Sequence, residues 1–179
     1  MVPEVLRGIL PFFAHGRVVR GFGRGGKQLN CPTANFPEAV VEKLPASVPN
    51  GVYYGWASVD NGEVHPMCMS IGYNPQFRNT KKTMEVHILH SYEDDFYDSQ
   101  LKIVILGYIR PMASFDSLEA LTEAIEQDKR AATNAAHSQH SASYQYHTFF
   151  RPGGEKSVTN GGVERCGLPP RSPEIKSLV

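Results

Sequence analysis

A glycine-rich cationic segment is the first part of this sequence with a chemistry of its own. Residues 21–28, Gly-Phe-Gly-Arg-Gly-Gly-Lys-Gln, nearly match the phosphate-binding pattern in which glycines present backbone N–H groups and a lysine adds charge. Gln28 stands in place of the magnesium-binding hydroxyl residue, and Pro32 follows too closely for a helix to start. We therefore expect a mobile flap suited to phosphates, although the motif alone fits a flexible surface loop equally well.

Thr33 and Asn35 stand a few residues downstream and are candidate metal ligands. In an extended segment alternate side chains share one face, so a hydroxyl and an amide carbonyl would point the same way. Magnesium prefers oxygen ligands and commonly keeps waters and substrate phosphates, which would have to supply the negative charge here. The alternative is a Thr/Asn pair that only organises a turn, the commoner role of these residue types.

Glu85 is an acidic residue in a segment that predicts a strand. The segment 84–91 alternates, which places Glu85 on one face with His87 and Leu89. An acid between apolar neighbours on a strand is unusual unless it is paired or functional. The residues by themselves favour a solvent-facing glutamate on an edge strand. His87 and His90 fall on opposite faces and do not form a chelating pair.

The elements that must position these residues are mainly strands. Two strands, 52–59 and 64–71, flank a hairpin signal at Asn61-Gly62, and the almost wholly apolar run within 101–109 predicts a central strand. A shorter strand is expected over 16–21. Short connections favour an antiparallel barrel or sandwich. Helical spacing of Leu118, Leu121, Ala124 and Ile125 predicts a helix from Ser117 to about Ala132.

Composition narrows the class of protein. The 179 residues carry 18 basic and 18 acidic side chains, a balance that argues against a nucleic-acid binder. Three cysteines without a Cys-x-x-Cys pair argue against a disulfide framework or a zinc site, and no segment predicts a membrane span or signal peptide. We expect a cytoplasmic monomer with an extension over 1–14, a domain over 15–150 and a disordered tail over 151–179.

Eight blocks in order identify the sequence as resembling the riboflavin kinase family, in its stand-alone eukaryotic form. The blocks cover residues 10 to 130 almost without a gap, and together they are highly specific. They are 16–25, 32–37, 51–57, 70–75, 84–89, 95–97, 107–111 and 115–121.

The resemblance implies a fold, an activity and a set of site residues. The fold is a mainly β, six-stranded antiparallel Greek-key β-barrel with a C-terminal α-helix. The activity is transfer of the γ-phosphoryl of ATP, the co-substrate, to the ribityl 5′-hydroxyl of riboflavin, giving FMN and ADP. The implied roles are general base for Glu85, magnesium (or zinc or another divalent ion) ligation for Thr33 and Asn35, nucleotide binding for Gly21, Lys27, Thr33, Ile88, His90 and Tyr97, and flavin binding for Arg110 and Phe115.

Two other functions remain open at this point. One is a flavin- or nucleotide-binding barrel without turnover, against which the intact Thr33, Asn35 and Glu85 argue. The other is an RNA-binding β-barrel that uses Arg17, Arg20, Arg24 and Lys27. Zero net charge and the lack of aromatic residues interleaved with these cations argue against it. Residues 131–148 depart from the family pattern, and the chain is too short for a second, FAD-forming domain, so we expect FMN as the product.

Overall fold

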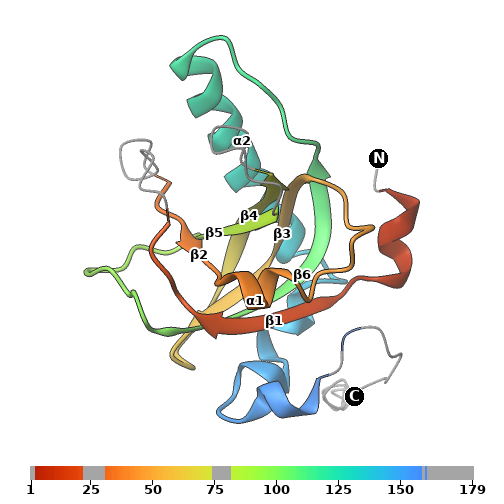
Figure 1. Cartoon of the computed structure of the whole chain (residues 1–179), viewed down its shortest axis with the longest axis vertical. Coiled ribbons are helices and arrows are strands. Elements are labelled where there is room, and N and C mark those ends of the chain that lie inside the picture. The colour runs from red at the N-terminus through yellow and green to blue at the C-terminus, as the bar shows by residue number, and fades with distance from the viewer. Residues whose placement is uncertain (1–2, 22–30, 74–81, 159, 161–179) are drawn as a thin grey trace, which may run out of the picture.

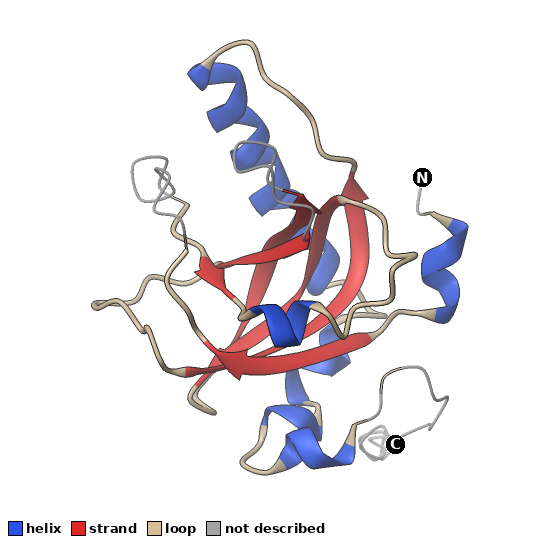
Figure 2. Cartoon of the chain, in the orientation of Figure 1, coloured by secondary structure: helices blue, strands red, loops and turns tan. Residues whose placement is uncertain are grey.

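Six antiparallel strands form one curled sheet in the computed structural model, which describes residues 3–21, 31–73, 82–158 and 160. The spatial order is β1-β6-β3-β4-β5-β2 (Figures 1 and 2). The mainly β fold with a C-terminal helix is confirmed, and the sheet has the shape of a half-barrel. The strands are β1 (Phe12–Arg17), β2 (Ala34–Asn35), β3 (Gly51–Val59), β4 (Val64–Tyr73), β5 (Lys82–Ile88) and β6 (Gln100–Arg110). The helices are η1 (Glu4–Gly8), α1 (Glu38–Val41), α2 (Leu118–Ala136), η3 (Ala142–Tyr146), η4 (Thr148–Phe150) and η5 (Gly154–Ser157).

The hairpin of β3 and β4 forms where the sequence predicts it, but its turn is not centred on the predicted Asn61-Gly62 pair. Gly62 donates its N–H to the Val59 carbonyl at 2.9 Å, and Asp60 and Asn61 between them have φ of 50° and 57°. Two successive left-handed residues make the turn whose twist matches the flanking strands. The turn is therefore centred on Asp60-Asn61, one residue before the Asn-Gly pair.

Strand β6 is central, as its apolar run predicts. It pairs with β1 on one side and with β3 on the other, and Ile103, Val104 and Ile105 are all buried. A strand covered on both faces loses the alternation of a half-exposed strand, because neither face meets water. The apolar cores on the two faces of the sheet consequently meet at β6.

The two edges of the sheet approach each other at β2. The prediction of a strand over 16–21 is wrong, because β1 begins at Phe12 and ends at Arg17. Beyond it, Val19 makes an isolated antiparallel bridge to Asn35 and donates its N–H to the Asn35 carbonyl at 3.0 Å. Since β2 also pairs with β5, this bridge links the continuation of β1 to the opposite edge (Figure 1).

Helix α2 starts at the predicted cap and runs farther than predicted. Ser117 accepts a hydrogen bond from the Ala120 N–H at 3.1 Å, which satisfies one free donor of the first turn. The helix ends at Ala136, four residues later than expected. Its buried positions are Asp128, Ala132 and Ala136, whereas Leu118 is 62 % exposed. Of the expected apolar face, Leu121, Ala124 and Ile125 are half-buried and Leu118 is exposed, at the end of the helix that projects beyond the sheet (Figure 2).

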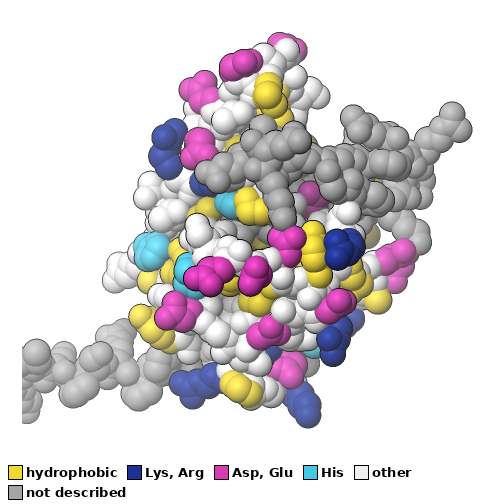
Figure 3. All heavy atoms as spheres, turned by 90° about the vertical axis from the view of Figure 1, so that its left-hand side faces the viewer, with side chains coloured by type: hydrophobic (Ala, Val, Ile, Leu, Met, Phe, Trp, Pro, Cys, Tyr) yellow, Lys and Arg dark blue, Asp and Glu magenta, His cyan; other side chains and the backbone are white. Residues whose placement is uncertain are grey.

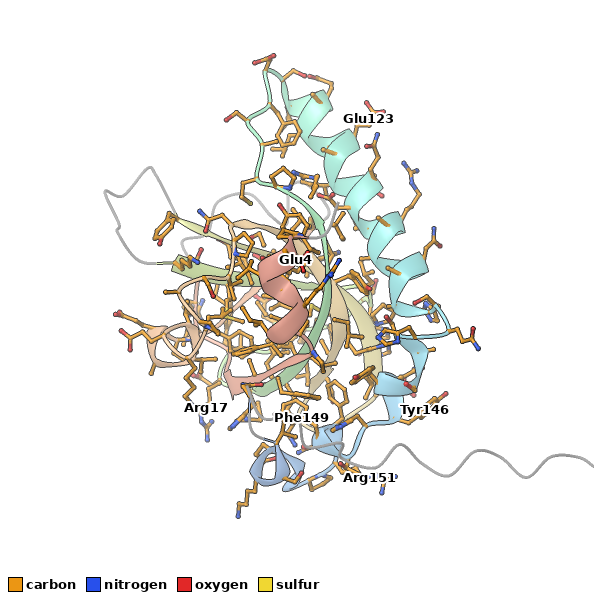
Figure 4. All side chains as sticks on the ribbon, turned by 90° about the vertical axis from the view of Figure 1, so that its right-hand side faces the viewer. Glu4, Arg17, Glu123, Tyr146, Phe149 and Arg151 are labelled. Atoms are coloured by element: carbon orange, nitrogen blue, oxygen red, sulfur yellow. The ribbon has the colours of Figure 1, made fainter. Side chains whose placement is uncertain are left out.

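Both ends of the described chain contribute to the packed structure. Leu6 and Phe12 belong to the main core, so the expected boundary after residue 14 falls inside β1. On the C-terminal side, Phe149 lies against the sheet, while Tyr146 points outward and is 71 % exposed (Figure 4). Asn160 bonds the Phe13 N–H and carbonyl at 2.9 and 2.7 Å, which pairs the free edge of β1. The described structure therefore extends beyond the expected 15–150 range on both sides.

None of the helices in the described ranges combines the length and the apolar character that spanning a bilayer requires.

We predict that Lys102→Met destabilises the fold. Lys102 is buried, and its Nζ donates to the carbonyls of Phe149 (3.2 Å) and Arg151 (2.8 Å) while pairing with Glu155 at 2.7 Å. Loss of the ammonium leaves two carbonyls without their donor, so the free energy of unfolding should fall by about 3 kcal/mol in urea titrations at neutral pH. The exposed Lys43→Met should change it by less than about 0.5 kcal/mol. Equal urea midpoints for parent and Lys102→Met would contradict this account.

Candidate active site

The pairing of β2 with β5 sets Asn35 directly opposite Glu85. On its other side Glu85 lies opposite Ser70 of β4. Burial alternates around the two residues: Ala34 and Phe36 on either side of Asn35, and Met84 and Val86 on either side of Glu85, are buried in the core. Glu85 and Asn35 consequently share the other face, where both are half-buried. Directly opposed residues in an antiparallel pair have neighbouring side chains, so the expected base and an expected metal ligand are brought together.

Gly21 lies against the side chain of Asn35. A Cβ on Gly21 would overlap the Asn35 amide, so the absence of a side chain is what allows this approach. The start of the flap segment therefore lies next to the candidate metal ligand. Lys27, the other flap residue expected to bind nucleotide, lies outside the described residues.

Residues 31–33 lead into β2 and lie beside α2. Thr33 is exposed, and the Pro32 carbonyl accepts a hydrogen bond from His87 Nδ1 at 2.8 Å. Burial is the main cause that raises the pKa of the Cys31 thiol; Lys129 opposes it, and Glu126, Asp128 and Glu85 add to it. The middle of α2 and Glu85 are thus both within electrostatic reach of Cys31.

Arg110 is held by a two-point ion pair that the sequence analysis missed. Its Nε and Nη2 donate to the two carboxylate oxygens of Asp128 at 2.8 and 2.6 Å. The guanidinium carbon lies 5.6 Å from the centre of the Phe115 ring, so both expected flavin residues meet at the end of β6. Asp128 is only 7 % exposed. Its place four residues before the buried Ala132, a charge on a buried helical stripe, is the signal that marks it.

Three residues expected to bind the nucleotide, Ile88 at the end of β5 and His90 and Tyr97 beyond it, lie in three different environments. Ile88 is 5 % exposed and belongs to the main core. The His90 ring stacks on His65 with 3.9 Å between centroids and contacts Tyr92 edge-on at 4.9 Å. The Tyr97 ring lies 4.4 Å from the guanidinium carbon of Arg20, which leads towards Gly21. His90 and Tyr97 therefore offer side-chain surface, and Ile88 offers main chain.

The surface on this side of the molecule mixes charge signs. Figure 3 shows acidic and basic side chains interspersed with apolar ones over the described surface, and acidic groups at the top where α2 lies. Among the described residues, no three His, Cys, Asp or Glu side chains are grouped so as to hold a metal ion. Thr33 and Asn35, the two residues expected to bind a metal, carry neutral oxygen donors.

Comparison with known proteins assigns the family. The family model described as riboflavin kinase, or flavokinase, matches residues 9–136. The chain belongs to the riboflavin kinase family. This range contains all the candidate residues, from Gly21 to Phe115, and also Asp128. The departure expected over 131–148 falls mostly beyond the matched range.

Individual riboflavin kinases are similar to the chain in sequence and in structure. Riboflavin kinase of Homo sapiens is 60 % identical over 119 residues, covering 66 % of this chain and 77 % of that protein. The Pyricularia oryzae enzyme is 45 % identical over 134 residues, covering 66 % and 67 %. The crystal structure of riboflavin kinase from Trypanosoma brucei superposes with a TM-score of 0.64 at 33 % identity, covering 78 % of this chain and 88 % of the other.

We predict that Gly21→Ala slows the conversion of riboflavin to FMN by at least about tenfold. The added methyl group would overlap the Asn35 amide, so that amide or the Gly21 backbone has to shift. A displacement of about 1 Å at a site residue can lower a catalytic rate by this much or more. The measurement is initial-rate chromatography of FMN. Gly8→Ala is the matched control, because a Cβ there meets nothing within 4 Å. Equal rates for Gly21→Ala and the parent would show that Asn35 tolerates the displacement.

The ion pair between Arg110 and Asp128 predicts strong coupling in a double-mutant cycle. Arg110→Met and Asp128→Asn should each destabilise the fold, and the double variant should recover about 2 kcal/mol relative to the sum. The reason is that each single substitution leaves the charge of the other residue without its partner at the end of β6. Urea denaturation of the four proteins measures the coupling. Additive effects within about 0.3 kcal/mol would mean that the pair adds nothing to the docking of α2.

Proposed function

We propose that this chain transfers the γ-phosphoryl group of ATP to the ribityl 5′-hydroxyl of riboflavin, giving FMN and ADP. The observation that carries the proposal is the register of β2 against β5. It sets the Asn35 amide opposite the Glu85 carboxylate, with Thr33 two residues away on the exposed side. Membership of the riboflavin kinase family supplies the substrates, and the register supplies a base and neutral oxygen ligands on one surface.

In the proposed mechanism Glu85 acts as the general base. A primary alcohol is a weak nucleophile, and a neighbouring carboxylate accepts its proton as the new P–O bond forms. The γ-phosphoryl leaves ADP in the same displacement, so the enzyme mainly positions the reactants and offsets charge. Glu85 is half-buried and lies between Asn35 and Ser70, two neutral side chains. Neither of the two residues opposite Glu85 is a cation that would form an ion pair with its carboxylate, so these two positions leave the carboxylate able to accept the proton of the alcohol.

Magnesium is the metal that these residues fit. The Thr33 hydroxyl and the Asn35 amide oxygen are hard, neutral donors, and the described residues group no three His, Cys, Asp or Glu of the kind that zinc prefers. When bound, the ion would neutralise charge on the phosphates. We propose that Thr33 and Asn35 hold it together with phosphate oxygens and water.

The remaining roles follow from where the side chains lie. We propose that Gly21, Lys27, His90 and Tyr97 contact the nucleotide by side chain or backbone, and that Ile88 does so by its main chain only. Arg110 and Phe115 face the flavin, with Asp128 fixing the guanidinium. We also propose that the protein acts as a monomer in a reducing compartment such as the cytoplasm, without nucleic acid. The free thiols of Cys31 and Cys68 agree with such a compartment.

Glu85→Gln is predicted to lower kcat for FMN formation by a factor on the order of 10² to 10⁴, with little change in the KM of either substrate. The amide keeps the shape and hydrogen-bonding reach of the side chain but cannot accept the proton. The assay is chromatography of protein incubated with riboflavin, ATP and magnesium. The exposed Glu93→Gln serves as the control and should retain the parental rate.

Each outcome of this assay discriminates between functions. FMN from the parent and hardly any from Glu85→Gln supports both the activity and the base. FMN at equal rates from both would remove Glu85 as the base while leaving the kinase activity. Well-folded parent protein that retains riboflavin but forms no FMN would instead support a binding module without turnover.

A further inference from the structure

His87 is a buried polar side chain next to the site that the chemistry above does not use. It is 9 % exposed and follows Glu85 by two residues on the same face of β5. Its Nδ1 lies 2.8 Å from the Pro32 carbonyl oxygen. A carbonyl oxygen only accepts, so Nδ1 carries the hydrogen and donates it. Burial is the largest cause that lowers the pKa of His87, and the hydrogen bond to the Pro32 carbonyl opposes it.

The hydrogen bond between His87 and Pro32 lies just outside the ladder of backbone pairs that joins β2 to β5. Strand β2 contains only Ala34 and Asn35, so its pairing with β5 starts one residue after Thr33. Pro32 stands immediately before Thr33 and is itself exposed. Thr33 is therefore bounded by two attachments to the same strand: the His87–Pro32 bond on one side and the pairing of β2 on the other.

We propose that His87 is a positioning residue that holds the Pro32–Thr33 backbone, so that the Thr33 hydroxyl faces the same surface as Asn35 and Glu85. A single strand, β5, would then carry the base and also align both metal-ligating residues. The inference deepens the proposed function, because it rests on Thr33 being a ligand of the metal that accompanies the nucleotide. Residues that orient a ligand typically change metal affinity by 10- to 100-fold when they are altered.

Two amide substitutions separate this role from mere core packing. Asparagine places its NH₂ two bonds from Cβ, as in Nδ1, whereas glutamine places it three bonds from Cβ, as in Nε2. His87→Asn can therefore still donate to Pro32, and His87→Gln cannot do so from the same rotamer. The two variants are alike in polarity and differ by one methylene group.

Binding and exchange measurements test the proposal without turnover. Calorimetric titration with ADP and magnesium should show about tenfold weaker binding for His87→Gln and less than twofold weaker binding for His87→Asn. Hydrogen exchange at the backbone amides of 33–35 should be about tenfold faster in His87→Gln alone. Riboflavin binding, followed by its fluorescence, should be the same in all three proteins. In initial-rate assays, His87→Gln should raise the KM for magnesium–ATP more than it lowers kcat.

The outcomes decide the inference and the proposed function separately. If His87→Asn and His87→Gln weaken binding equally, or neither does, the hydrogen bond to Pro32 has no positioning role and the inference is overturned. Thr33→Ala tests the underlying metal role. If that variant binds ADP and magnesium like the parent, Thr33 is not a ligand and the proposed metal site fails. The exchange rates at 33–35 still report on the His87 bond in that case, because they require no metal.

Discussion

One two-residue strand, β2, pairs with β5 and is bridged to the continuation of β1, and this structure depends on those two contacts. Asn35 faces Glu85 in the β2–β5 ladder, and its carbonyl accepts the N–H of Val19 from the continuation of β1. The same residue therefore helps to close the curl of the sheet and presents its amide to the site. Gly21 must lie against that amide, which explains why a residue without Cβ is required there.

A second constraint acts at the other side of the site, where α2 meets the end of β6. The bidentate pair between Arg110 and Asp128 fixes the orientation of the guanidinium as well as its position, because two parallel bonds define a plane. Its carboxylate comes from the buried stripe of the helix. The first turns of α2 project beyond the sheet, and Leu118 is left exposed there. The helix is thus buried at positions from Asp128 to its last residue, Ala136, whereas Leu118 at the end nearest Phe115 is exposed.

The opposite end of the half-barrel is closed by the C-terminal segment. The ammonium group of the buried Lys102 donates hydrogen bonds to two backbone carbonyls of this segment, which would otherwise require water. Phe149 packs against Phe13 of β1 and Val104 of β6 (Figure 4). This closure secures the most apolar strand, β6, whose far end carries Arg110. Strand β6 therefore runs from the part of the fold that Lys102 and Phe149 close to the part of the candidate site that carries Arg110.

The sequence by itself determined the class of fold, the central strand and the cap of α2, because periodicity, apolar runs and N-cap chemistry are local properties. It also singled out Thr33, Asn35 and Glu85 as candidates. It could not place the first strand, the centre of the hairpin turn or the apolar face of α2. These depend on which partner covers each surface, and Leu118, on the predicted apolar face, is 62 % exposed. Tertiary structure alone paired Asn35 with Glu85, Arg110 with Asp128 and His87 with Pro32. Each of these pairs joins residues that are far apart in the chain, and their meeting follows from strand register and helix docking, which no local pattern encodes.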